Sequence, residues 1–170
     1  VNKNHMKQWD VETDTLWKDA ARNSRRLLPA EFFTMNYALK EILRKNVGCR
    51  EKSTVENLLI GDTCSRDGMY VLSNKFRNYG AACIAYPHVL EMIGGILRSD
   101  YYVLPSSVHE VVIVPYCDNI TAAELDEMVR DINLTQVAEE EVLSDHAYLY
   151  DVKAGYLKRG TEFMTGGVAG

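Results

Sequence analysis

The sequence predicts an α+β fold in which helices pack on an antiparallel sheet. Short runs of β-branched and aromatic residues, such as 69–73 and 101–104, are typical of strands. Stretches with apolar residues at helical spacing alternate with them. The chain has 170 residues, of which 46% are hydrophobic and 25% charged, as in an ordinary globular protein. This length suffices for one sizeable core, so we expect a single domain over residues 1–170.

Residues 1–45 are expected to be a helical N-terminal part. Thr13 is followed by Leu16 and Trp17 at helical spacing. A hydroxyl residue before such a pattern is typical of an N-cap. The pattern therefore predicts a helix over about 14–24.

A break and a second helix are expected next. Pro29 interrupts the helical pattern, so residues 29–35 are expected to be irregular. Asn36 is expected to cap a helix that ends before Gly48. Residues 46–68 are polar and are expected to form a loop or surface insertion, with a helical turn around 55–60.

The core is expected at residues 69–151. The expected strands are 69–73, 81–86, 101–104, 109–114 and 146–151. One helix is expected to begin at Pro87. Another begins after Thr121, which forms a capping box with Glu124. From residue 81 the order is strand, helix, strand, strand, helix, strand, which is the split βαβ, ferredoxin-like pattern. Right-handed crossovers would place both helices on one face of the sheet.

Glycines mark two further features. Gly94 and Gly95 lie inside the first of these helices, where each costs about 1 kcal/mol relative to alanine. A close approach to another backbone would explain them. The last residues, 160–170, are glycine-rich and are expected to be a flexible tail.

Charge and composition argue against several functional classes. The net charge of −5 argues against a nucleic-acid binder, whose affinity comes largely from cations that neutralise phosphates. The tightest basic cluster is interpreted as a solvated helix end, and its members are Arg22, Arg25 and Arg26. The sequence has no run of eighteen apolar residues, so it predicts no membrane span, and it shows no apolar leader.

The cysteines and the first residue give two more expectations. The four cysteines show no CxxC spacing, so reduced thiols in a cytoplasmic protein are expected, with no metal site and no cofactor. The chain begins with Val1, which suggests a piece of a longer protein or a processed start.

The densest group of polar residues comprises Ser106, Ser107, His109 and Glu110. On a strand, Ser107 and His109 would share a face, with Glu110 on the other. A serine and a histidine can form a nucleophile and its base. However, no GxSxG motif is present, and two residues along a strand are about 6–7 Å apart. The structural alternative is a turn whose hydroxyls bind backbone amides.

Asp145 and His146 would add a carboxylate and a second imidazole if the last strand lies beside residues 109–114. With His88 they would supply metal-ligand types, but their spacing matches no metal motif, so a structural role is preferred. Tyr148 and Tyr150 alternate on the last strand, where they would line a binding face or cover an edge of the core.

Four segments resemble a known family. They are Val71-Leu72-Ser73-Asn74-Lys75, Tyr79-Gly80-Ala81-Ala82, Leu104-Pro105-Ser106-Ser107-Val108-His109-Glu110-Val111 and Glu141-Val142-Leu143-Ser144-Asp145. The chain resembles, over about 69–151 and more weakly over 1–35, an uncharacterised domain-of-unknown-function family of anaerobic gut bacteria. The resemblance implies a cytoplasmic bacterial protein with a further segment before Val1. It supplies no activity, substrate or catalytic residue.

The sequence therefore leaves two hypotheses of function. The leading one is a non-catalytic interaction or ligand-binding domain, which binds a protein partner or a second copy of itself. It rests on missing catalytic motifs, the tyrosine-rich second half and the open edges expected of a sheet. The alternative is a small hydrolase or transferase that uses Ser107, His109, Asp145 or His146.

Overall fold

The computed structural model describes residues 1–46, 56–61 and 66–161, and these build an α+β structure around an antiparallel sheet. Its strands are β1 (Ala30–Thr34), β2 (Tyr70–Asn74), β3 (Tyr101–Leu104), β4 (Val111–Pro115), β5 (Tyr148–Asp151) and β6 (Tyr156–Arg159). The sheet order is β1-β2-β4-β3-β5-β6, and every neighbouring pair is antiparallel. The predicted α+β class is confirmed.

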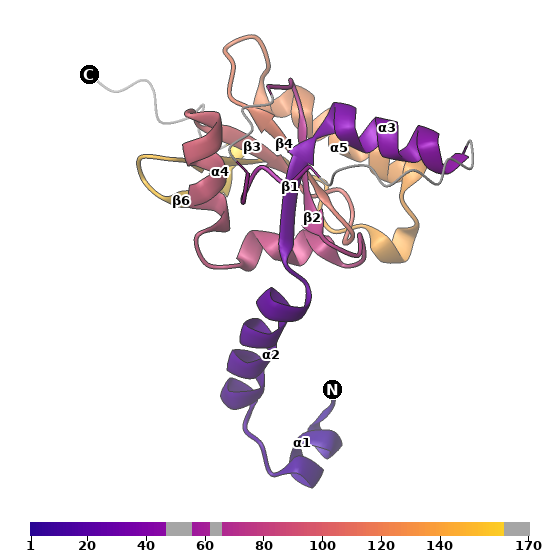
Figure 1. The fold of residues 1–170 in the computed structure, drawn as a ribbon, viewed down its shortest axis with the longest axis vertical. Helices are drawn as coiled ribbons and strands as arrows, with labels where there is room; N and C mark the ends of the chain where they lie inside the picture. Colours follow the sequence, from indigo (N-terminus) through magenta and orange to yellow (C-terminus); the bar gives the residue numbers. More distant parts are fainter. Residues whose placement is uncertain (47–55, 62–65, 162–170) are drawn as a thin grey trace.

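The helices lie on both faces of the sheet and beyond it (Figure 1). They are α1 (Lys3–Trp9), α2 (Thr13–Leu27), α3 (Met35–Asn46), α4 (Val89–Leu97) and α5 (Ala122–Gln136), with the 3₁₀ helices η1 (Gly80–Ala85) and η2 (Glu139–Glu141). Helix α4 lies on one side of the sheet, and α3 and α5 lie on the other.

The strand β3 shows why the two faces are both buried. Its alternate residues Tyr101 and Val103 pack in one apolar cluster with Ile93 of α4. The next residues along the strand, Tyr102 and Leu104, pack in a second cluster with α5. Because neighbouring side chains of a strand point to opposite faces, α4 and α5 cover opposite faces. The prediction that both helices share a face is therefore wrong.

The strand order explains this difference. The unit β2–α4–β3 is a split βαβ, since β4 lies between its two strands. In the ferredoxin-like order the last strand would lie beside β2, but here β1 occupies that edge and β5 pairs with β3. The second crossover, β4–α5–β5, thus moves across the sheet in the same direction as the first, from a strand that runs the opposite way. A right-handed connection then places α5 on the other face.

Two predicted elements are wrong. Residues 29–35 contain the edge strand β1, because Pro29 precedes the strand and does not interrupt its pairing with β2. Residues 81–86 form η1 instead of a strand. Its short apolar run fits a buried helical turn as well as a strand, and periodicity alone does not separate them. The first strand of the split βαβ unit is consequently β2.

The remaining elements differ from the predicted ones mainly at their ends. Helix α2 begins at Thr13, after the N-cap Glu12, and α3 begins at Met35, where Thr34 Oγ1 accepts the N–H of Tyr37 at 3.1 Å. The expected first-turn proline, Pro87, lies outside α4, whose N-cap is His88.

The capping box of α5 is confirmed. Thr121 Oγ1 accepts the N–H of Glu124 at 3.2 Å, and Glu124 Oε2 accepts that of Thr121 at 2.8 Å. Helix α5 is followed by the single 3₁₀ turn η2. Strand β6 was not predicted, and the expected tail lies outside the described residues from 162 onward.

The outer edge of β1 is covered. Asn57 Oδ1 accepts the N–H of Phe32 at 3.2 Å, and the Leu58 N–H donates to the Phe32 carbonyl at 2.7 Å. Leu58 is also buried in the core. The predicted loop at 46–68 therefore has an anchored part, while 47–55 and 62–65 lie outside the described residues. An open edge at β1 no longer supports an interaction function.

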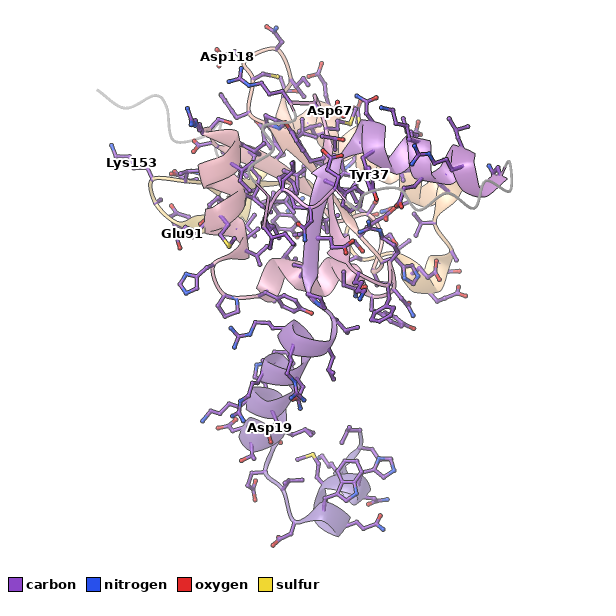
Figure 2. All side chains as sticks on the ribbon, in the orientation of Figure 1. Asp19, Tyr37, Asp67, Glu91, Asp118 and Lys153 are labelled. Carbon is purple, nitrogen blue, oxygen red and sulfur yellow. The ribbon has the colours of Figure 1, made fainter. Side chains whose placement is uncertain are left out.

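Helices α1 and α2, here called the arm, extend away from the sheet (Figure 1). Neither helix contains a buried residue. Its root is fixed, since Tyr86 Oη donates to the Leu28 carbonyl at 3.1 Å and the Lys75 N–H donates to the Pro29 carbonyl at 3.2 Å. Figure 2 shows the side chains of the arm, Asp19 among them, in open space around the helix.

Candidate functional site

The first candidate group lies before β4 and joins four segments of the chain. We call it the His109 cluster, and its members are Ser73, Tyr79, Gly80, Ser107, His109 and Glu141. The His109 carbonyl accepts the Gly80 N–H at 2.9 Å and the Ser73 hydroxyl at 2.8 Å. On its other side, the segment forms a β-bridge between Ser107 and Val142. The cluster therefore ties residues 79–81 and 141–143 to the start of β4.

The imidazole of His109 has a partner at each nitrogen. Nδ1 accepts the backbone N–H of Tyr79 at 3.2 Å, and Nε2 lies 3.0 Å from Glu141 Oε1. A nitrogen that accepts an N–H carries no proton of its own, so the proton is on Nε2 and is donated to Glu141. This tautomer leaves neither nitrogen with a free lone pair.

The geometry does not form a nucleophile and base from Ser107 and His109. Ser107 Oγ accepts the backbone N–H of His109 at 3.1 Å, which is the local bond expected of a hydroxyl in a turn. With Nδ1 occupied and Nε2 acting as donor, the imidazole has no site at which to take a proton from a hydroxyl. The contacts fit the structural alternative.

The adjoining turn needs a glycine and a buried amide. A Cβ at position 80 would lie 2.6 Å from the backbone N of Asn74 and 2.6 Å from the His109 carbonyl O, besides contacting Ser73 Oγ. Asn74, which is 1% exposed, accepts the Phe76 N–H at 2.9 Å and donates to the Asn78 carbonyl at 2.6 Å. Asn74 and Gly80 thus fix the chain that brings Tyr79 to the imidazole.

The other predicted members of this group, Ser106 and Glu110, are not hydrogen-bond partners of the His109 imidazole. The Ser106 carbonyl accepts the Leu143 N–H at 3.1 Å, which extends the bridge to the segment after η2. Glu110 is exposed. In the described part of the chain, neither side chain forms a hydrogen bond or ion pair with His109, whose carboxylate partner is Glu141. Sequence spacing did not indicate Glu141, because it is distant along the chain.

A second group lies before β5, and we call it the His146 cluster. Its members are Asp126, Asn133, Ser144, Asp145, His146 and Arg159. Asp126 of α5 is 5% exposed, and its Oδ1 accepts the Ala147 N–H at 2.7 Å. Its Oδ2 lies 3.2 Å from His146 Nδ1. A carboxylate held in this way can orient the ring of a histidine.

The same cluster holds Asp145 from a different side. Asn133 Nδ2 donates to Asp145 Oδ1 at 2.7 Å and to the Ser144 carbonyl at 2.9 Å. Asp145 is therefore an anchor for α5 and not the partner of His146. The sequence did not single out Asp126, since nothing local distinguishes it from the other acids of its helix.

Arg159 of β6 lies over the His146 ring, with Nη2 at 3.0 Å from Nδ1 and 2.9 Å from Nε2. The side chain of His146 is 34% exposed, so the ring and the guanidinium together face solvent. His146 therefore lies between a buried carboxylate and an exposed guanidinium. The Ser144 hydroxyl makes local contacts, since its Oγ accepts the His146 N–H at 3.2 Å and lies 3.4 Å from the Tyr148 hydroxyl.

The two clusters share no hydrogen bond or ion pair among the described residues. Within the same part of the chain, no group of three or more His, Cys, Asp or Glu side chains is placed to hold a metal ion. His88, the third predicted imidazole, pairs with Glu91 at 3.1 Å on the exposed start of α4.

The two tyrosines of β5 belong mainly to the core. Tyr150 stacks on Tyr101 with ring centroids 5.1 Å apart, and burial raises the pKa of both phenols. Tyr148 is half-buried, with its hydroxyl 3.4 Å from Ser144 Oγ. Tyr150 also borders a small depression of about 240 Å³ next to Tyr86 and His88.

A family comparison covers nearly all of this structure. Residues 1–152 match the model of a family of unknown function, DUF5688. The chain belongs to this family. The match of this DUF5688 protein spans the arm, the His109 cluster and the segment through His146, whereas Arg159 lies beyond it. Searches of curated proteins and of solved structures find no match.

The described part of the DUF5688 protein has exposed apolar surfaces on the arm and on α3. On the arm, Trp9 is 53%, Trp17 73% and Leu27 60% exposed. On α3, a stripe of large apolar residues is also exposed, and its members are Leu39, Ile42 and Leu43. No helix in the described ranges is both long and apolar enough to span a bilayer.

Proposed function

We propose that this DUF5688 protein is a non-catalytic interaction domain in which the sheet is a scaffold and the arm binds a macromolecular partner. One observation carries the proposal. Helix α2 is amphipathic over 15 residues, yet it buries none of them within its own chain. An apolar helix face of this kind is the usual ligand of a groove or of another helix.

The stability of an isolated helix supports the same conclusion. Helices of about 12–15 residues are only marginally stable in water without tertiary packing. Helix α2 also lacks a side-chain hydrogen bond at its N-cap, Glu12. A partner that covers Trp17 and Leu27 would supply the missing packing.

The His109 cluster supports a scaffold role for the sheet. Its imidazole, carbonyl and hydroxyl groups hydrogen-bond to neighbouring segments and hold the chain between β3 and β4. Fully satisfied buried or half-buried polar groups fix one arrangement of the backbone. The polar residues that first suggested chemistry therefore have a structural use.

The experiment is site-specific photocrosslinking in cells that naturally contain the protein. A photoreactive residue replaces Trp17 of the arm or, as the control, the exposed Lys153 of the turn between β5 and β6. We expect a crosslinked species from position 17 and none from position 153. The absence of any crosslink at position 17, and at Leu27 in a second variant, would contradict the proposal.

A second candidate function is a small hydrolase or transferase, favoured by the Asp126–His146 pair. Its buried carboxylate lies 3.2 Å from the ring, and the His146 side chain is 34% exposed next to Arg159. The test is turnover of chromogenic ester and phosphate substrates by the native protein and by His146→Ala. Turnover that disappears in His146→Ala would support this candidate, and equal background rates in both would exclude it for these substrates.

The proposal includes a cytoplasmic location in a bacterium. Cys83 and Cys117 are free thiols, as expected in a reducing compartment. Fractionation of the natural host, with detection of the protein in the soluble fraction, tests this point.

A further inference from the structure

Helix α2 has an uneven distribution of charge along its length. Its first half contains Asp14 in the first turn and Asp19 near the middle, against one cation, Lys18, and Asp19 lies 3.5 Å from Arg22 of the same helix. The last turns contain Arg22, Arg25 and Arg26. A helix that is acidic at one end and basic at the other is complementary to a copy of itself that runs in the opposite direction.

The charges also lie on suitable sides of the helix. Asp14 and Arg25 are separated by about three helical turns, so both project from the same flank of the apolar stripe. They lie at nearly equal distances on either side of Ala20, the centre of the helix. In an antiparallel pair centred at Ala20, Asp14 of each copy faces Arg25 of the other.

The apolar stripe matches this arrangement. Its central positions, Ala20 and Ala21, are small and permit two helix backbones to approach closely. The bulky Trp17 then lies opposite the short Ser24 of the second copy. Trp17 and Leu27, both more than half exposed in the single chain, become covered.

A second copy has other apolar helix surfaces to which α2 could bind. Their charges argue against such binding. The exposed stripe of α3 is flanked by Lys40 and Arg44, which would repel the basic end of α2. The outer face of α5 contains Glu127 and Asp131 beside one cation, Arg130, so its net negative charge would repel the acidic end of α2. Of these three helix surfaces, a second α2 is the one that places opposite charge against both ends of α2.

We propose that α2 pairs with α2 of a second copy in an antiparallel, two-fold symmetric dimer. This inference depends on the proposed interaction function and names its partner. The dimer buries the apolar stripe of both arms and leaves the two sheets free at its ends.

The experiment is sedimentation velocity of the full chain over a concentration series. The wild-type protein is expected to shift from monomer to dimer as concentration rises. Trp17→Glu is expected to weaken the dimer at least about a hundredfold, since a central aromatic is lost twice. Leu39→Glu on α3 and Met128→Glu on α5 are matched controls and are expected to leave the dimer unchanged.

Charge exchange tests the antiparallel register. Asp14→Arg and Arg25→Asp are each expected to weaken the dimer roughly tenfold, because two ion pairs become repulsive. The combined variant restores opposite charges and is expected to recover wild-type affinity. Circular dichroism of each variant shows whether the sheet remains folded.

Three outcomes would overturn this inference. They are a wild-type chain that is monomeric at all concentrations, a combined variant that does not recover, and a dimer that Leu39→Glu or Met128→Glu disrupts. A monomeric chain that still crosslinks through position 17 to a different protein would refute self-pairing alone and leave the interaction function intact. A monomeric chain without any crosslink would refute both.

Discussion

The imidazole of His109 shows how a residue with catalytic chemistry can instead connect two segments of the chain. Its two nitrogens contact the Tyr79 N–H at 3.2 Å and the Glu141 carboxylate at 3.0 Å. Replacing it by alanine leaves a backbone donor and a carboxylate without their partner. We expect His109→Ala to lower the free energy of unfolding by about 2–3 kcal/mol, measured by urea denaturation.

The tautomer of His109 provides an independent check on the same assignment. Nitrogen-15 NMR of the native protein is expected to show the Nε2–H form, since Nδ1 accepts a hydrogen bond. Ser107→Ala serves as the comparison, because its hydroxyl makes only a local bond to the His109 N–H and its loss is expected to leave the tautomer unchanged. An Nδ1–H signal would show that the imidazole is free to act as a base at Nε2.

Two cysteines differ in reactivity for a physical reason that is local to each. Burial raises the pKa of the Cys83 thiol to about 11, whereas Cys117 is exposed. At pH 8 only about one Cys83 in a thousand is then a thiolate, and access is blocked as well. A short pulse of iodoacetamide, followed by peptide mass spectrometry, is expected to label Cys117 and spare Cys83.

The rate at which Cys83 is labelled is expected to change with pH and with unfolding. Raising the pH toward 11 increases its thiolate fraction, so its labelling is expected to rise with pH, still limited by burial. Urea at pH 8 is expected to expose Cys83 and equalise the two sites. Rapid labelling of native Cys83 at pH 8 would contradict its place in the core.

At the scale of elements, Gly80 of η1 and Gly95 of α4 have opposite predicted effects on substitution by alanine. A Cβ at Gly80 would lie 2.6 Å from backbone atoms of Asn74 and His109, so Gly80→Ala is expected to cost at least about 2 kcal/mol. Nothing lies within 4 Å of a Cβ at Gly95, so Gly95→Ala is expected to stabilise the protein by about 0.5–1 kcal/mol. Thermal and urea unfolding measure both.

The third glycine, Gly94, shows whether tight packing explains a glycine in this helix. Its Cβ would lie 2.7 Å from Val152 Cγ2, in the turn after β5. The predicted close approach to another backbone is therefore wrong, because the neighbour of Gly94 is a side chain and a Cβ at Gly95 has no neighbour within 4 Å. Gly94→Ala is therefore expected to cost more than Gly95→Ala, and a gain at Gly94 equal to that at Gly95 would contradict the packing described here.

The same elements show what sequence patterns can and cannot predict. The capping box at Thr121 and Glu124 was predictable because both partners lie within one turn. Strand β1 and the helix η1 were not, since a proline at a strand start and a short apolar run each fit two structures. The partners of His109 and His146 were also missed, because Glu141 and Asp126 approach them only through tertiary contacts.

At the scale of the whole molecule, the sheet order decides which surfaces are available. Placing β5 beside β3 sends α5 to the face opposite α4, so the centre of the sheet is covered on both sides. The covered edge at β1 removes one route to self-association that the sequence suggested. The arm, which the sequence predicted only as a helix, then offers an unpartnered apolar face on the described chain.

The exposed arm and the buried sheet are expected to differ in local stability. Amides of β2, β3 and β4 lie in the core of the sheet, so their exchange with solvent requires broad unfolding. Amides of α2 have no buried side chains above them and exchange through local fraying. Hydrogen exchange is therefore expected to be fast in α2 and slow in these strands when the protein is dilute.

Protein concentration then separates a free arm from a paired one. If α2 pairs with a second copy, its protection is expected to rise with concentration, while that of β2–β4 stays constant because the sheet is the same in monomer and dimer. Trp17→Glu is expected to remove the rise in α2 and leave the strands unaffected. Protection of α2 that is strong at every concentration would mean that the arm already packs within its own chain, which would contradict both the exposed stripe and the interaction proposed for it.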